Sequence, residues 1–163
     1  MTDALRAAAT AVLAAARARG WKIATAESCT GGLVAGALTE IAGSSDVFDR
    51  GFVTYSNTAK QQVLGVPADI LREHGAVSRE TAEAMARGAL GKAKVDIVVA
   101  ITGVAGPGGG TPEKPVGLVH FAASTRAGKL THHEARYGDI GRSLVREKSV
   151  LQALAMLKEM AEK

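Results

Sequence analysis

Apolar residues recur along the chain with two different spacings, and these predict alternating helices and strands. Spacings of three and four residues predict four long helices, over residues 3–19, 31–41, 79–90 and 139–162. Shorter apolar or alternating runs predict five strands, over residues 21–26, 50–55, 95–101, 116–124 and 129–137. Two short helices are expected between them, one ending at Gly65 and one between Pro67 and Gly75.

Capping residues mark several of these ends. Asp3 is a candidate N-cap of the first helix, and Gly20 is its expected stop. Ser56 or Asn57 could cap the first short helix, and Ser78 the third long one. The second long helix is expected to turn one apolar face inward, made of Leu33, Val34, Ala37, Leu38 and Ile41.

The order of the elements predicts the fold class. The run VDIVVAI at 95–101 is apolar throughout and rich in β-branched residues, which is typical of a strand covered on both faces. The last two strands follow each other directly and are expected to form a hairpin. Helices and strands alternate along a chain of 163 residues, enough for one hydrophobic core. We expect residues 1–163 to form a single layered α/β domain, a mixed β-sheet flanked by helices.

Composition limits the partners. No apolar stretch is long enough to span a bilayer and no secretory pattern opens the chain, so a cytoplasmic location and no membrane partner are expected. The net charge of +4 permits an anionic partner, and a small phosphorylated ligand would satisfy it. Because the basic residues are scattered and aromatic residues are few, we do not expect nucleic-acid binding. The alanine-rich first helix could form the interface of a homo-oligomer.

The turn ESCTGG at 27–32 follows the first predicted strand and carries a candidate nucleophile. Ligands of open α/β sheets bind at the carboxyl ends of strands, where Ser28 lies. The amides of Thr30, Gly31 and Gly32 would lie at a helix N-terminus and could stabilise an oxyanion. The alternative is structural: Ser28 or Thr30 is an N-cap, and the glycines allow close packing.

Cys29 is a rival nucleophile in the same turn. A helix N-terminus would lower the pKa of its thiol, but cysteine is also a common small buried residue. A cysteine nucleophile usually works with a histidine, and all four histidines lie outside the loops expected to form the site. His132 and His133 are adjacent and would point to opposite faces of a strand, so they form no metal pair. No metal or other cofactor is expected.

A serine nucleophile also needs a base, and the segment YSNTAK at 55–60 offers one. Lys60 would lie on the first turn of a helix, and Tyr55 at a strand end. Burial would lower the pKa of Lys60 toward neutrality, and the tyrosine hydroxyl could relay a proton. The alternative is an edge tyrosine and a solvated lysine.

Two further segments could bind a ligand. The loop TGVAGPGGGTPEKP at 102–115 matches neither a P-loop nor a dinucleotide fingerprint, but its length and place favour a ligand-covering loop. GDIGR at 138–142 opens the last predicted helix, where Arg142 and Arg146 could clamp a phosphate or lie on a solvated face.

Together these motifs resemble the CinA C-terminal domain family. The matching stretches are TAESCTGG, YSNTAK, GAVSRETAEAMARG, AITGVAGPGGGTPEKPVGLV and GDIGR. They cover nearly the whole chain in the family's order, and the chain is similar to the stand-alone form of the family. Its enzymatic members are nicotinamide-nucleotide amidohydrolases, which hydrolyse the carboxamide of nicotinamide mononucleotide to nicotinate mononucleotide and ammonia in pyridine nucleotide salvage.

The resemblance implies roles for particular residues. It implies a serine nucleophile assisted by lysine and tyrosine without a metal, and these roles fall on Ser28, Lys60 and Tyr55. Ligand contacts are expected from the glycine-rich loop and the last helix, namely Thr102, Gly103, Gly106, Gly108 and Arg142. The expected partner is therefore a pyridine nucleotide. The alternative is a non-catalytic module that binds a nucleotide or a DNA-processing partner, as the family's association with competence and DNA damage would suggest.

Overall fold

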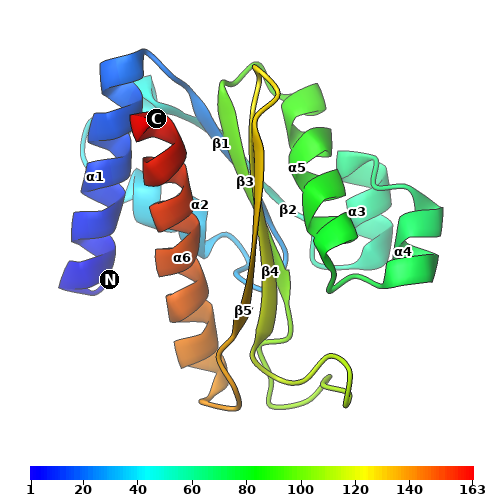
Figure 1. Cartoon of the computed structure of the whole chain (residues 1–163). Coiled ribbons are helices and arrows are strands. Elements are labelled where there is room, and N and C mark those ends of the chain that lie inside the picture. Colours follow the sequence, from blue (N-terminus) through cyan, green and yellow to red (C-terminus); the bar gives the residue numbers. More distant parts are fainter.

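A five-stranded sheet lies between two layers of helices in the computed structural model, which describes residues 1–163 (Figure 1). The strands are β1 (Ile23–Glu27), β2 (Phe48–Val53), β3 (Ile97–Gly103), β4 (Leu118–Thr125) and β5 (Leu130–Arg136). The helices are α1 (Asp3–Arg19), α2 (Leu33–Thr39), α3 (Asn57–Leu64), α4 (Ala68–His74), α5 (Arg79–Lys92) and α6 (Arg142–Glu162). One 3₁₀ turn, η1 (Ser44–Asp46), precedes β2.

The sheet is mixed, with the order β2-β1-β3-β4-β5. β1 runs parallel to β2 and β3, whereas β4 is antiparallel to both β3 and β5. The expected hairpin is the β4–β5 pair. The fold class expected from the sequence, a layered α/β domain with a mixed sheet, is therefore confirmed.

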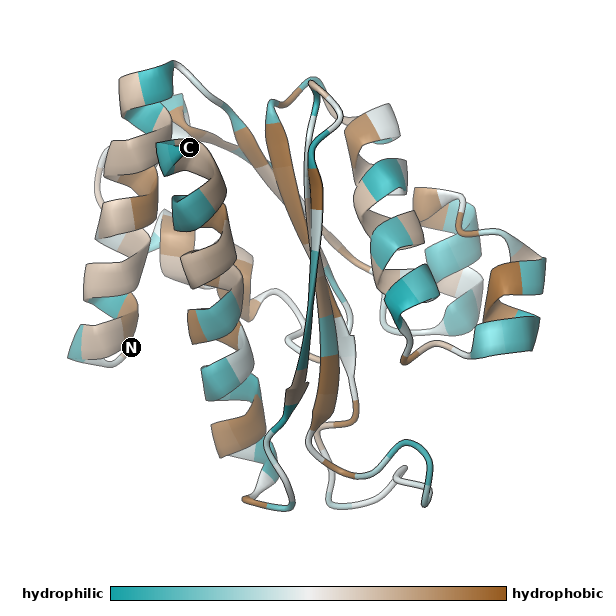
Figure 2. Cartoon of the chain, viewed as in Figure 1, coloured by the Kyte–Doolittle hydropathy of each residue, from teal (hydrophilic) through white to brown (hydrophobic).

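Each face of the sheet has its own hydrophobic core. One core lies under α1, α2 and α6, and the other under α3, α4 and α5. β3 contributes to both, because Val99 and Ile101 face the first core while Val98 and Ala100 face the second. Figure 2 shows the result as brown central strands with teal positions on the outer helix surfaces. The interpretation of β3 as a strand covered on both faces is confirmed.

The chain path brings the loops that follow β1 and β2 together at the carboxyl ends of these strands. These neighbouring strands are parallel, but β1 leads into α2 on one face of the sheet and β2 leads into α3 on the other. Adjacent connections that leave to opposite faces open a space outside the strand ends, the usual ligand position in open α/β sheets. Loop residues after β1 and β2 therefore meet there.

Several boundaries differ from the sequence-based expectation. Thr2, not Asp3, is the N-cap of α1: its hydroxyl accepts a hydrogen bond from the Leu5 amide at 3.2 Å, and Asp3 lies in the first turn. α6 begins at Arg142 rather than at 139, because Gly141 has a φ of 98°, outside the helical region. Leu33 is 44% exposed rather than in the core.

Two of the three parallel strands, β2 and β3, are displaced by about two residues from the expected ranges. The structure places them at Phe48–Val53 and Ile97–Gly103 instead of 50–55 and 95–101. The caps Gly20, Ser56 and Ser78 are where the sequence predicts them. None of the helices combines the length and apolar character that crossing a membrane requires.

Candidate active site

Ser28 and Lys60 meet directly beyond the carboxyl ends of β1 and β2. Ser28 is the first residue after β1 and is 7% exposed, and Lys60 comes from α3 and is 1% exposed. The Lys60 Nζ lies 2.8 Å from the Ser28 Oγ, at hydrogen-bond distance. The structure thus brings together two residues 32 positions apart that the sequence marked as candidate nucleophile and base.

The surroundings of Lys60 favour the neutral amine. Besides Ser28, its Nζ contacts only two backbone carbonyl oxygens, that of Thr54 at 2.8 Å and that of Tyr55 at 3.3 Å. No carboxylate pairs with it, and burial lowers the pKa of Lys60 below its ordinary value of 10.5. A neutral amine has two N–H groups and one lone pair. With the two N–H groups donated to the carbonyls, the lone pair can accept the Ser28 hydroxyl proton.

Local sequence explains why the Lys60 side chain points toward Ser28. The Ser56 hydroxyl caps α3 by accepting a hydrogen bond from the Ala59 amide at 3.0 Å. The helix therefore starts immediately after the β2 turn, and Lys60 lies within its first turn, on the same face as Leu64. Leu64 packs in the core under α5, which holds this face of the helix against the sheet.

The turn at residues 28–32, called the Ser28 turn below, does not leave all three of the expected oxyanion-binding amides free. The amide of Gly31 donates to the Ser28 carbonyl at 3.0 Å, and that of Gly32 donates to a Glu27 carboxylate oxygen at 3.2 Å. The amides of Cys29 and Thr30 have no protein acceptor. Of the three residues expected to bind an oxyanion, only Thr30 has a free amide, and Cys29 supplies the second free one.

Arg142 and Arg146 bind the protein rather than forming a free phosphate clamp. Arg142 donates to the Gly106 carbonyl and to the Tyr55 hydroxyl, both at 2.8 Å. Arg146 donates to the carbonyls of Cys29 and Thr30 at 3.1 and 3.3 Å. One arginine therefore joins the glycine-rich loop to Tyr55, and the other holds the Ser28 turn.

The residues of the glycine-rich loop fall into different environments. Thr102 lies on β3 beside the turn, and its hydroxyl donates to the Ala76 carbonyl at 2.7 Å. A Cβ at Gly103 would lie 2.7 Å from the Val119 side chain, so this glycine allows β3 and β4 to pack closely. Gly106 has a φ of 86° and presents its carbonyl to Arg142, whereas Gly108 is exposed and has free space around it.

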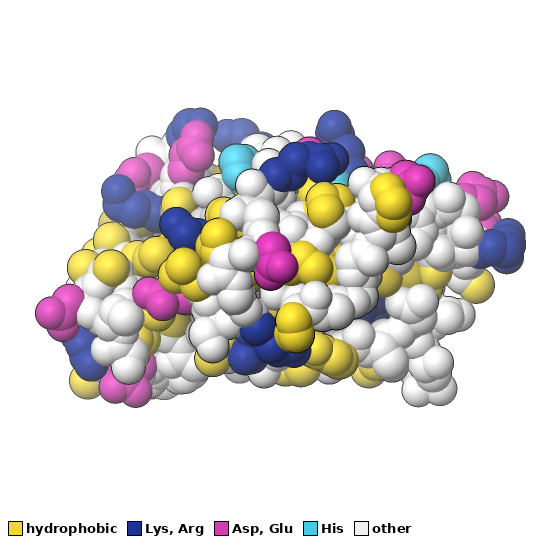
Figure 3. Space-filling view, turned by 90° about the horizontal axis from the view of Figure 1, so that it is seen from below, with side chains coloured by type: hydrophobic (Ala, Val, Ile, Leu, Met, Phe, Trp, Pro, Cys, Tyr) yellow, Lys and Arg dark blue, Asp and Glu magenta, His cyan; other side chains and the backbone are white.

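Tyr55 lies at the mouth of the site. Its side chain is 60% exposed, and its hydroxyl is bound by Arg142 rather than by Ser28 or Lys60. Further exposed apolar side chains lie at the start of α2, at the end of β2 and at the start of α6, namely Leu33, Val53, Ile140 and Leu144. Figure 3, which views this end of the molecule, shows basic and apolar side chains adjoining one another. The expected interface of a homo-oligomer on α1 stays a prediction.

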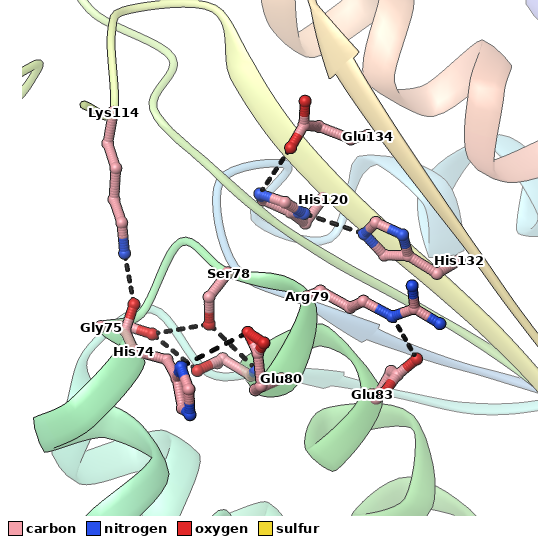
Figure 4. Close-up of polar contacts among 11 residues, drawn as sticks. His74, Gly75, Ser78, Arg79, Glu80, Glu83, Lys114, His120, His132 and Glu134 are labelled. Carbon is pink, nitrogen blue, oxygen red and sulfur yellow. Dashed lines mark hydrogen bonds and ion pairs between the residues drawn. The ribbon is translucent and has the colours of Figure 1, made fainter. Parts of the chain in front are cut away.

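Cys29 and the histidines lie outside this constellation. Cys29 is buried, and burial raises the pKa of its thiol to about 12, which makes the thiolate scarce at neutral pH. His120 Nδ1 lies 2.9 Å from His132 Nε2 on the α5 side of the sheet (Figure 4). The ring of His133 packs near Phe121 on the other side. Burial lowers the pKa values of His120 and His132. None of the histidines contacts Ser28.

One functional candidate escaped the sequence analysis. Glu27 is fully buried directly before Ser28, and its carboxylate accepts a hydrogen bond from the Gly32 amide. An acidic residue at the end of a buried strand and next to a helix start was the available signal for Glu27. No group of three or more histidine, cysteine or acidic side chains comes together to hold a metal ion. The largest cavity, about 640 Å³, lies between α1, α2 and α6, behind the turn.

Known proteins share this arrangement of elements over the whole chain. The family model of the CinA C-terminal domain matches residues 5–161. This chain belongs to the CinA C-terminal domain family. The solved structure of the competence/damage inducible protein CihA from Agrobacterium tumefaciens superimposes with a TM-score of 0.97 at 53% identity, over 100% of this chain and 98% of that chain.

CinA-family relatives of two lengths match the chain. Nicotinamide-nucleotide amidohydrolase PncC of Escherichia coli is 52% identical over 144 residues, which are 88% of this chain and 86% of that protein. A CinA-like protein of Syntrophobacter fumaroxidans is 52% identical over 141 residues, which are 86% of this chain but 33% of that protein. The chain thus spans about a third of the length of the longer relatives and most of the length of the shorter ones.

Proposed function

We propose that the protein is a nicotinamide-nucleotide amidohydrolase that converts nicotinamide mononucleotide to nicotinate mononucleotide and ammonia through a serine acyl-enzyme. The observation that carries the proposal is the buried Ser28–Lys60 pair at 2.8 Å, with no acidic partner for the lysine. The similarity to the E. coli amidohydrolase over most of both chains supports the substrate class. The product would return the pyridine ring to nucleotide synthesis.

The first half-reaction forms the ester. Neutral Lys60 takes the proton of the Ser28 hydroxyl as Oγ attacks the carboxamide carbon. The contact is direct, so no relay through Tyr55 is needed. The oxyanion is stabilised by the free amides of Cys29 and Thr30. Lys60 then passes its proton to the leaving nitrogen, the C–N bond breaks, and ammonia departs.

The second half-reaction releases the acid. Lys60, neutral again, takes a proton from a water molecule, whose oxygen attacks the ester carbon in front of the same two amides. Collapse of this intermediate breaks the bond to Oγ, and Lys60 returns the proton to Ser28. The pyridinium charge of the substrate withdraws electrons from the carbonyl carbon in both steps.

The mouth of the site supplies the remaining contacts. Tyr55 offers an exposed ring on which a pyridine can stack. Arg142 and the loop around Gly106 lie next to that ring and would hold the ribose and phosphate. Binding a phosphate at Arg142 requires that it exchange a contact to the Gly106 carbonyl or to Tyr55. Thr102 and Gly108 are proposed as further contacts from the same loop.

The test is ammonia release from a panel of nicotinamide mononucleotide, nicotinamide riboside and NAD, with the acid product identified by chromatography. We expect turnover of the mononucleotide and its loss in Ser28→Ala. Ser124→Ala is the matched control, since Ser124 is a buried serine at the opposite end of the sheet. Wild-type turnover by Ser28→Ala would refute the mechanism. Absence of deamidation together with tight, salt-sensitive DNA binding would favour the binding-module alternative.

A further inference from the structure

Glu27 is a buried carboxylate without a cationic partner. It ends β1, is 0% exposed, and forms no ion pair. Instead it accepts five hydrogen bonds, from the hydroxyls of Thr25 and Thr30 and from the backbone amides of Gly32, Val34 and Ala35. An isolated buried charge is strongly unfavourable, so the hydrogen-bond donors at the N-terminus of α2 must supply its stabilisation.

These contacts determine which amides of the turn are occupied. One carboxylate oxygen of Glu27 binds both the Thr30 hydroxyl at 2.7 Å and the Gly32 amide at 3.2 Å. The Gly31 amide closes back onto the Ser28 carbonyl. The amides of the two residues that directly follow Ser28, Cys29 and Thr30, are the ones left without an acceptor.

Arg146 holds the same turn from the other side. It binds the carbonyls of Cys29 and Thr30. In a trans peptide the C=O and the following N–H point in opposite directions. A Cys29 carbonyl bound to Arg146 therefore turns the Thr30 amide away from the arginine. Glu27 and Arg146 together leave the turn little freedom to rotate its peptide planes.

The charge of Glu27 also occupies the positive end of α2. Three amides of the first turn of this helix point at its carboxylate. An oxyanion formed at Ser28 therefore cannot use the α2 terminus and depends on the Cys29 and Thr30 amides. The negative charge of Glu27 also contributes to raising the pKa of the Cys29 thiol, after the larger effect of burial.

We propose that Glu27 is a positioning residue of the acyl-transfer site: without contacting the substrate, it holds the 28–32 turn so that the amides of Cys29 and Thr30 remain available to the oxyanion. This inference rests on the proposed function, because the oxyanion arises only if Ser28 carries out the proposed acyl transfer. A displaced oxyanion donor reduces turnover more than substrate affinity, because it acts in the transition state. The expected signature is a lower kcat with a nearly constant KM.

Glu27→Gln is the first test variant. It keeps the shape of the side chain but directs an NH₂ group at backbone N–H donors. We expect kcat for ammonia release to fall about 100-fold, the cost of losing an oxyanion donor, with KM within about threefold of wild type. Glu40→Gln, a half-exposed residue at the C-cap of the same helix, is the matched control and should leave kcat unchanged. A loss confined to KM, or kcat per folded molecule within threefold of wild type, would overturn the proposal.

Thr30 gives a second pair of variants in case Glu27→Gln does not fold. Thr30→Val keeps the shape but removes the hydroxyl that binds Glu27, and kcat should fall about tenfold as the turn loosens. Thr30→Ser restores the hydroxyl and should recover most of that loss. Equal kcat values for these two variants would overturn the positioning role. Thermal unfolding of every variant separates lost positioning from lost fold.

A separate readout distinguishes failure of this proposal from failure of the proposed function. p-Nitrophenyl acetate reports acylation of Ser28 as a burst of p-nitrophenol, with Ser28→Ala as the blank. If the wild type gives a burst but no ammonia, the proposed substrate is wrong, and Glu27 is judged from the burst rate of its variants. If the wild type gives neither burst nor ammonia, both proposals are overturned. A normal burst rate in Glu27→Gln overturns the positioning role alone.

Discussion

Replacing Lys60 separates two roles that a buried lysine can have at a serine nucleophile. Lys60→Met keeps the length of the side chain and removes the nitrogen, whereas Lys60→Arg keeps a positive charge that cannot be lost. In the proposed mechanism the neutral amine of Lys60 accepts the Ser28 proton across 2.8 Å. Neither a methionine nor a permanently charged arginine can accept this proton. A general base contributes about 10²–10⁴-fold, or about 3–5 kcal/mol of activation free energy. We expect kcat to fall by this amount in both variants.

The pH dependence follows from the direction of the pKa shift. The reactive form is the neutral amine, and burial lowers the pKa of Lys60 below 10.5. kcat/KM of the wild type should therefore rise with pH through this lowered pKa and reach a plateau below pH 10.5. The assay is ammonia release between pH 5 and about 10. The base role would be refuted if Lys60→Arg kept activity within tenfold of wild type, or if the same rise persisted in Lys60→Met.

Stability gives an independent check of the same shift. The unfolded state binds the proton with a pKa near 10.5, while the folded state binds it more weakly. Lys60 therefore costs stability below its folded pKa, and this cost disappears as the pH rises through the window up to 10.5. Wild type should gain stability relative to Lys60→Met over that window, as measured by denaturant unfolding. A pH-independent difference between the two proteins would contradict the lowered pKa.

Three further predictions concern other parts of the site and its support. Cys29→Ala should keep kcat within about threefold of the wild-type value. Iodoacetamide should not label the folded wild type at neutral pH, because the thiol is buried and its pKa is raised. Full inactivation by alkylation at Cys29 alone would contradict this prediction. Gly88→Ala should destabilise by about 1–3 kcal/mol, since its Cβ would lie 1.9 Å from the Leu64 carbonyl oxygen. Gly91 lies in the same helix with free space where a Cβ would be added, so Gly91→Ala should stabilise the protein by about 0.5–1 kcal/mol. Equal denaturant midpoints for the two alanine variants would contradict both expectations. Arg142→Lys should raise KM about tenfold with little change in kcat, since lysine lacks the planar fork with which the guanidinium of Arg142 binds the Gly106 carbonyl and the Tyr55 hydroxyl through separate nitrogens. An unchanged KM in steady-state kinetics would exclude that contact.

Local patterns were sufficient for most of the fold. Periodicity predicts every long helix and strand, and the caps Ser56 and Ser78 mark helix starts. The errors lie at boundaries, where neighbouring residues compete for the same role. Thr2 displaces Asp3 as a cap, and α6 starts only after two glycines with positive φ, Gly138 and Gly141. Such choices depend on backbone angles that a residue type only biases.

The candidate site also has a part that the sequence predicts and a part that only the tertiary structure decides. Ser28 and Lys60 can be chosen from residue chemistry, the place of each after a strand, and the resemblance to a known family. That they touch depends on strand order, because β1 and β2 must be neighbours whose following helices leave to opposite faces. No spacing in the sequence encodes that adjacency.

The sequence by itself determined which chemical groups follow the strands along the chain: a serine, a lysine, a glycine-rich loop and an arginine. The tertiary structure alone decided how they are used. It buries Lys60 away from any carboxylate, which lowers its pKa, and it directs Glu27 to the N-terminal amides of α2, which leaves those of Cys29 and Thr30 free. The physical reason is that desolvation and hydrogen-bond allocation depend on every group within a few ångströms, and most of those neighbours are distant along the chain.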